Sequence, residues 1–70
     1  MGISKESAAR ILEAGGSLKV QNMSKDSLVE LAAIARRRGV RLEIKGALSA
    51  DSMVEIAKVG GQNVLFDVAD

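Results

Sequence analysis

The chain has 70 residues with a formal net charge of +1, and it contains neither cysteine nor histidine. We therefore expect a single domain over residues 1–70, which disulfide bonds and His/Cys metal sites cannot stabilise. A chain this short buries only about 60% of the surface that its unfolded state exposes, so association with other copies or with a partner is the support that remains. No stretch approaches the roughly 18 apolar residues of a membrane span, and no basic segment followed by an apolar one opens the chain, so we expect a cytoplasmic protein without a membrane partner.

One sequence pattern occurs three times. The stretch SKDSLVELA that begins at Ser24 returns at Ser49 as SADSMVEIA, 25 residues later, and a weaker copy, SKESAARIL, begins at Ser4. Glycine and then a short alternating apolar run follow each copy, so the repeated unit is helix, glycine stop, strand. Repeats of about this length are typical of solenoids, in which no unit can bury its apolar face alone.

The first unit, residues 3–22, predicts a helix near residues 4–14 and a strand over residues 17–21. Ser4 is suited to capping the start of the helix, and Gly15 and Gly16 to ending it. The helical positions that face a core are Ala8, Ile11, Leu12 and Gly15, with apolar Ala9 and Ala14 on the two flanks. In the strand, Leu18 and Val20 point to one side, and Ser17, Lys19 and Gln21 to the other.

The second unit, residues 23–47, predicts a helix near residues 24–38 that begins at Ser24 and ends at Gly39. Its core-facing positions are Leu28, Leu31, Ala32 and Ala35. In the strand that follows, Leu42 and Ile44 oppose Arg41, Glu43 and Lys45.

The third unit, residues 48–70, predicts a helix near residues 49–59 that begins at Ser49 and ends at the pair Gly60 and Gly61. Its core-facing positions are Met53, Ile56, Ala57 and Gly60, with Val54 and Val59 on the flanks. In the strand over residues 63–68, Val64, Phe66 and Val68 oppose Leu65 and Asp67.

These elements predict an α/β fold with a parallel three-stranded sheet, because connections of this length favour parallel strands and right-handed crossovers. The first two strands alternate instead of being continuously apolar, so the helices should cover one face of the sheet and leave the other open. Laying the strands side by side gives the rows Lys19, Glu43, Leu65 and Gln21, Lys45, Asp67. The rows place opposite charges beside each other, which favours this register.

The pattern Leu18-x-Val20-x-x-Met23, with Leu42-x-Ile44-x-x-x-Leu48, resembles the strand and turn of a leucine-rich repeat, whose period range includes 25 residues. Met23 and Ala47 stand where that family has its turn asparagine. The resemblance implies a curved solenoid with one layer of helices and a binding face on the strands.

Little in the sequence indicates catalysis. The paired serines of each helix start have no histidine to activate them, and the glycine pairs follow helices, whereas phosphate-binding loops precede them. Glu43 and Asp67 share the open strand face, where cations can pair with them and no apolar pocket is expected to raise a carboxyl pKa. We therefore expect neither an enzyme nor a cofactor.

The run Arg36, Arg37 and Arg38 has two interpretations. It ends the longest predicted helix, where cations suit the negative end of the helix dipole. With Arg10, Lys25 and Arg41 it could instead form a basic patch for phosphates. The near-zero net charge and the presence of a single aromatic residue, Phe66, disfavour nucleic acid as the partner.

The outer units keep apolar residues where natural solenoids have polar ends, which predicts self-association, with strand 63–68 of one copy beside strand 17–21 of the next. The result would be a ring or a filament. The residues assigned to this association are Val64, Leu65, Phe66, Val68, Leu18, Val20, Val54, Val59, Ala9 and Ala14.

Three alternatives remain open at the level of the sequence. One is a symmetric dimer through the same strand edges, and another is a fragment, natural or designed, of a longer array. The third is an adaptor that binds another protein through the open strand face, with Lys19, Gln21, Arg41, Glu43, Lys45 and Asp67 as its polar residues. Mixed charges and the lack of an aromatic anchor make a tight hot spot on that face hard to build.

Overall fold

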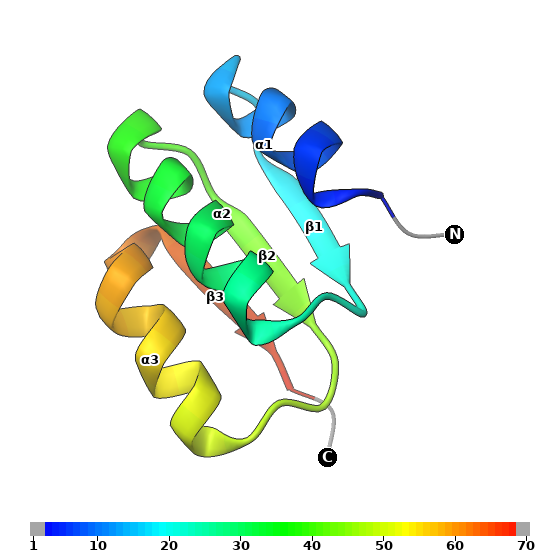
Figure 1. The fold of residues 1–70 in the computed structure, drawn as a ribbon. Coiled ribbons are helices and arrows are strands. Elements are labelled where there is room, and N and C mark those ends of the chain that lie inside the picture. The colour runs from blue at the N-terminus through cyan, green and yellow to red at the C-terminus, as the bar shows by residue number, and fades with distance from the viewer. Residues whose placement is uncertain (1–2, 69–70) are drawn as a thin grey trace.

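The computed structural model describes residues 3–68, in which helices and strands alternate. The elements in chain order are α1 (Lys5–Glu13), β1 (Leu18–Gln21), α2 (Lys25–Arg38), β2 (Leu42–Lys45), α3 (Ala50–Gly60), the short 3-10 turn η1 (Gly61–Asn63) and β3 (Val64–Asp67). The three helices lie side by side over one face of the sheet, with α2 in the middle (Figure 1). The predicted α/β class and the parallel three-stranded sheet are confirmed.

Each helix begins at the predicted serine. The hydroxyl groups of Ser4, Ser24 and Ser49 accept hydrogen bonds from the backbone N–H three residues further on, at 3.2, 3.3 and 3.1 Å. These bonds satisfy an amide that the first turn of a helix leaves unpaired. At the other end of α2, Gly39 takes the left-handed conformation with φ 70°, and its N–H donates to the carbonyls of Ala35 and Arg36.

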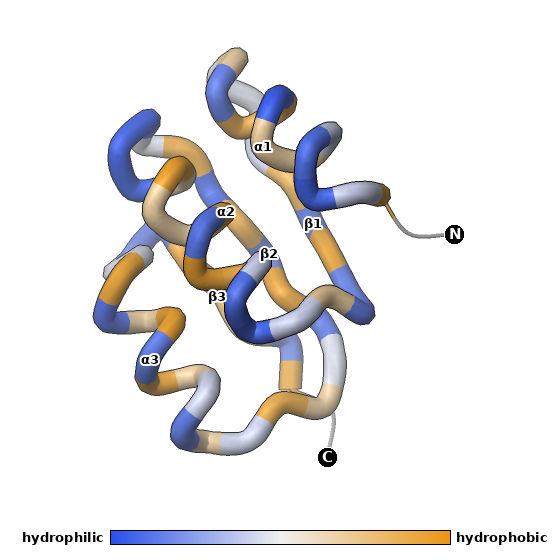
Figure 2. The backbone as a smooth tube through the Cα atoms, in the orientation of Figure 1, coloured by the Kyte–Doolittle hydropathy of each residue, from blue (hydrophilic) through white to orange (hydrophobic). Residues whose placement is uncertain are grey.

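The strands pair in the predicted register. The strand order is β1-β2-β3, and the rows are Leu18, Leu42, Val64; Lys19, Glu43, Leu65; Val20, Ile44, Phe66; and Gln21, Lys45, Asp67. Figure 2 shows hydrophobic and hydrophilic residues alternating along β1 and β2, whereas β3 begins with three hydrophobic residues. The apolar rows face the helices, and the other two rows lie on the open face.

The core lies between the helices and the sheet. Its buried residues are Ala8, Leu12, Val20, Leu28, Leu31, Ala32, Ala35, Leu42, Ile44 and Ile56. Four residues predicted to face the core do not belong to it: Ile11, Gly15 and Ala57 are exposed, and Met53 is half-buried. All four are in or next to α1 and α3, which have a neighbouring helix on one side only.

Gly60 lets α3 end in close contact with its neighbours. A Cβ atom there would overlap Cγ2 of Val64 and would lie 3.0 Å from Cβ of Ala32. We expect Gly60→Ala to lower the free energy of unfolding by about 1–2 kcal/mol, because the overpacking outweighs the better helix propensity of alanine. Urea denaturation followed by circular dichroism measures this loss.

The control for Gly60→Ala is the same substitution in a Val64→Ala background, where the atom that the new methyl group overlaps is gone. Gly60→Ala should cost less stability there than in the parent chain. An equal loss in both backgrounds would show that steric overlap with Val64 is not the cause.

Candidate functional site

Ion pairs join neighbouring helices along the chain. Nζ of Lys5 in α1 lies 3.2 Å from Oε1 of Glu30 in α2, and Nζ of Lys25 in α2 lies 3.2 Å from Oε2 of Glu55 in α3. Exposed pairs of this kind contribute at most about 1 kcal/mol each. These ion pairs show which flank of each helix faces the next helix and which flank faces the previous one.

The arginine run takes part in the same helix–helix contacts. Arg37 and Arg38 both bind the carboxylate of Glu13 in α1, with Nε of Arg38 at 2.9 Å from Oε1. Arg36 points to the other side and donates from Nη1 to the carbonyl oxygen of Val59 in α3 at 3.5 Å. All three guanidinium groups are thus engaged with neighbouring helices, which favours a structural role over a phosphate-binding patch.

The two arginines make the contribution of Glu13 to stability depend on pH. The hydrogen bond from Arg38, aided by the positive charges of Arg37 and Arg38, holds the pKa of the Glu13 carboxyl below its ordinary value of 4.5. A carboxyl group whose pKa is lower in the folded state than in the unfolded state stabilises the fold at pH values above its unfolded-state pKa. This stabilisation is lost as the pH falls through the folded-state pKa.

We therefore expect Glu13→Gln to lower the urea midpoint slightly at neutral pH, and the difference from the parent chain to shrink as the pH falls below 4.5. Added salt should reduce the difference at neutral pH, because the side chains are exposed. A difference that stays constant between neutral and acidic pH would contradict a charge-dependent role for Glu13.

The outer flank of α1 is open. Ser7, Arg10, Ile11 and Ala14 line a hollow there, to which no other helix or strand of residues 3–68 contributes. Ile11 corresponds in the repeat to Leu31 and Ile56, and those two side chains are 0% exposed, whereas Ile11 is 36% exposed. Leu31 and Ile56 directly follow Glu30 and Glu55, which pair with the preceding helix, whereas no helix of residues 3–68 lies on that side of α1. We call these four residues, together with the free edge of β1, the leading border.

The flank of α3 that faces away from α2 is also exposed. Val54 is 52% exposed, whereas the equivalent residues Ala9 and Val29 are half-buried against the core. Ala57 is also exposed, although its equivalents Leu12 and Ala32 are 0% exposed. We call Ala50, Val54, Ala57 and the free edge of β3 the trailing border.

The trailing border continues onto the end of β3. Leu65 is 46% exposed on the open face of the sheet, and Val68, just past the strand, is 57% exposed. Because β1 and β3 are the outer strands of the sheet, each has one side with no strand partner among residues 3–68.

The residues that the sequence assigned to self-association are not all at these borders. Ala14, Val54, Leu65 and Val68 are exposed, whereas Leu18, Val64 and Phe66 are half-buried against the core and Val20 is only 2% exposed. Ala9 and Val59 lie on the flanks that face α2, so neither residue is at a border. Ile11 and Ala57 belong to the borders instead, and their helical spacing, which is that of core residues, gave no signal of this.

The polar residues of the predicted partner face do lie together. Lys19, Gln21, Arg41, Glu43, Lys45 and Asp67 occupy the face of the sheet opposite the helices or the turn that leads into it. Nζ of Lys19 pairs with Oε2 of Glu43 at 3.5 Å, and the backbone N–H of Arg41 donates to the Ser17 hydroxyl at 3.1 Å. The face is therefore partly neutralised by its own charges.

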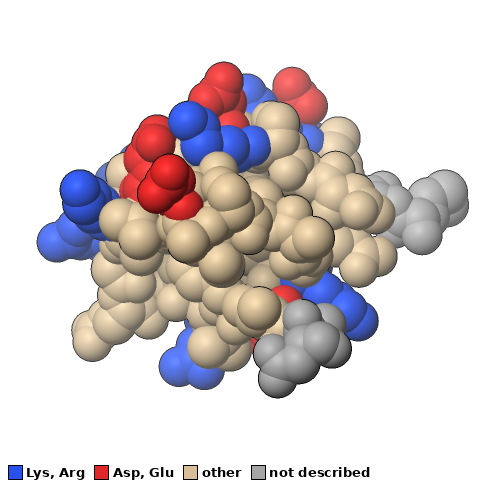
Figure 3. All heavy atoms as spheres, turned by 90° about the horizontal axis from the view of Figure 1, so that it is seen from below, with Lys and Arg blue, Asp and Glu red and all other residues tan. Residues whose placement is uncertain are grey.

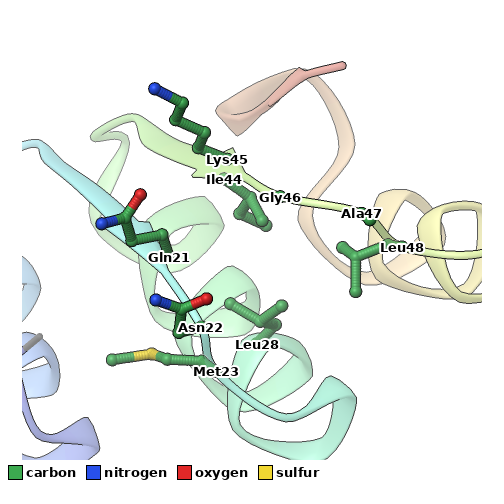
Figure 4. Close-up of a pocket in the computed structure, with 9 residues that line it drawn as sticks. All are labelled: Gln21, Asn22, Met23, Leu28, Ile44, Lys45, Gly46, Ala47 and Leu48. Atoms are coloured by element: carbon green, nitrogen blue, oxygen red, sulfur yellow. The ribbon is translucent and has the colours of Figure 1, made fainter. Parts of the chain in front are cut away.

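A small hollow lies between the turns that follow β1 and β2 (Figure 4). Its lining residues are Gln21, Asn22, Met23, Leu28, Ile44, Lys45, Gly46, Ala47 and Leu48. Its volume of about 90 Å³ is far below that of ordinary ligand pockets, which measure roughly 300–1,000 Å³. The ammonium group of Lys45 points away from the other labelled side chains. The hollow thus fits a few water molecules better than a cofactor.

Seen from below, the charged side chains gather around the outline of the molecule and leave a broad uncharged area between them (Figure 3). Residues 3–68 bring no three histidine, cysteine, aspartate or glutamate side chains together as a metal site would require. Within the same range, none of the helices is long enough and apolar enough to cross a membrane.

Comparisons with family models, with curated proteins and with solved structures gave no match.

Proposed function

We propose that the chain is a non-enzymatic structural module that associates with copies of itself. Its helix–strand units stack head to tail in the manner of a short solenoid similar to leucine-rich repeats. The trailing border of one copy packs on the leading border of the next, with β3 beside β1. The contact joins two different surfaces, so it produces a ring if the rotation closes and a filament if it does not.

One observation carries this proposal. Positions that are equivalent in the three repeat units are buried where two helices meet and exposed on the two outer flanks of the helix layer. Leu31 and Ile56 follow the glutamates that pair with the preceding helix and are 0% exposed, whereas Ile11 is 36% exposed. At the other end, Val54 is 52% exposed. The two outer flanks therefore have apolar residues at the positions that pack together twice within the chain, and stacking buries them in the same way.

The strand edges support the same contact. If the register of the sheet continues from one copy to the next, Leu65 lies beside Lys19 of the neighbour and Asp67 beside its Gln21. Neither pair places like charges side by side, and the Gln21 amide can donate to the Asp67 carboxylate. The free N–H and C=O groups of β1 and β3 would then form a parallel ladder.

The direct test is the mass of the protein in solution as a function of concentration, measured by light scattering after size-exclusion chromatography. We expect the mass to exceed that of one chain and to rise with concentration, and electron microscopy to show rings or filaments. A monodisperse monomer throughout the micromolar range would overturn the proposal.

A second candidate function is binding of another protein through the open strand face. The observation that favours it is Leu65, which is 46% exposed among the polar residues of that face. The Lys19–Glu43 pair and the absence of an aromatic side chain there disfavour a strong binding centre. Lys45→Glu separates the two functions, because it changes the face and leaves the helix flanks intact.

A further inference from the structure

The lysine–glutamate pairs that join neighbouring helices cannot form at a junction between copies, because the leading and trailing borders have other residues at these two positions. Within the chain, the first residue of one helix, Lys5 or Lys25, pairs with a glutamate of the next helix. The position equivalent to those glutamates is Arg10 on the leading border, and the position equivalent to those lysines is Ala50 on the trailing border. A junction between copies therefore lacks the ion pair that both internal contacts have.

Ala50 is followed by an acid, Asp51, which is exposed in the first turn of α3. Neither Arg10 nor Asp51 takes part in an ion pair among residues 3–68. We infer that the junction has a reversed ion pair, in which Arg10 of one copy binds Asp51 of the copy before it. This inference rests on the proposed head-to-tail association.

The geometry of the internal contacts supports the reversed pair. Glu30 and Glu55, the equivalents of Arg10, reach the first residue of the preceding helix. Arginine is longer than glutamate, so it can reach the second residue as well. Ala50 adds no positive charge that would repel the guanidinium group, whereas lysine at that position, as in the other two helices, would do so.

Two other charged residues, Glu6 and Lys58 of the neighbouring copy, lie on the helices that meet at the junction. Glu6 lies one turn earlier on the same helix, but it forms no ion pair with Arg10 in the structure. Lys58 of the neighbouring copy is equivalent to Glu13, which contacts Arg37 and Arg38. These arginines lie about two turns after Glu30, the equivalent of Arg10, so Lys58 should lie about two turns away from Arg10. Two turns are about 10 Å along the axis, which is a Debye length at ordinary salt, so repulsion from Lys58 is weak.

The reversed pair gives the junction specificity. The trailing border of α3 offers Arg10 an acid with no lysine beside it, whereas the equivalent flanks of α1 and α2 have Lys5 or Lys25 next to their acids Glu6 and Asp26. Mispaired stacking therefore brings a like charge close to Arg10, whereas correct stacking brings only an opposite charge.

The test uses two single substitutions and their mixture. Arg10→Glu introduces the residue type that the other two helices have at this position, and it faces Asp51 of the neighbour with a like charge. Asp51→Lys faces Arg10 with a like charge. We expect each variant alone to need roughly 3- to 10-fold higher concentration for half-maximal association. An equimolar mixture should associate like the parent chain, because every junction in an alternating stack then joins opposite charges.

Asp26→Lys is the matched control for Asp51→Lys, because it removes the acid at the equivalent position of α2 without touching either border. Glu6→Gln is the control for Arg10→Glu, since it removes the acid that could pair with Arg10 within α1. Neither control should change association. A parent chain that stays monomeric would overturn both proposals, whereas a mixture that associates no better than either variant alone would overturn the reversed pair and leave the stacking intact.

Discussion

Replacing Ile56 with alanine is expected to lower the free energy of unfolding by about 2–5 kcal/mol, which is the usual loss for a fully buried isoleucine. Ile56 in α3 is 0% exposed and belongs to the core between the helices and the sheet. A domain of this length has only about 4–10 kcal/mol of stability at the usual 0.05–0.15 kcal/mol per residue, so the variant should be partly unfolded under mild conditions. Thermal and urea denaturation followed by circular dichroism measure the loss.

Ile11→Ala is the matched comparison, because it makes the same chemical change at the equivalent position of α1. Ile11 is 36% exposed, so the loss in a single chain should be well below that of Ile56→Ala. Both variants are best compared in a Val54→Lys background, where association does not add to stability. Equal losses at the two positions would contradict the open leading border.

Much of the fold could be predicted because its signals are local. A serine hydroxyl caps an amide three residues away, so Ser4, Ser24 and Ser49 mark the helix starts without reference to the rest of the molecule. Alternation along a strand fixes which side chains share a face, and the opposite charges then favour the register that places Lys19 beside Glu43.

The arrangement of the helix flanks could not be predicted in the same way. Periodicity places Ala9 and Ala14 on opposite flanks of α1, but only the order of the helices in space decides which flank faces α2. Ile11 has the spacing of a core residue and is exposed because no helix precedes α1 in residues 3–68. The contact of Glu13 with Arg37 and Arg38 likewise depends on α2 being longer than α1.

Mixing two variants that each lose one border should produce a complex of two chains. Val54→Lys places a charge in the centre of the trailing border, and Ile11→Lys does the same on the leading border. Each variant alone should be monomeric, because a buried unpaired ammonium group costs several kcal/mol. Together they retain one intact junction, formed by the leading border of the Val54→Lys chain and the trailing border of the Ile11→Lys chain.

The mass of the mixture separates this arrangement from symmetric ones. If α1 packed on α1 of a second copy, Val54→Lys would associate like the parent chain, and if α3 packed on α3, Ile11→Lys would do so. Ala33→Lys is the control, because it adds the same charge at an exposed position of the middle helix and should leave association unchanged. Only a head-to-tail contact makes both variants monomeric alone and dimeric when mixed, since each chain then supplies the border that the other has lost.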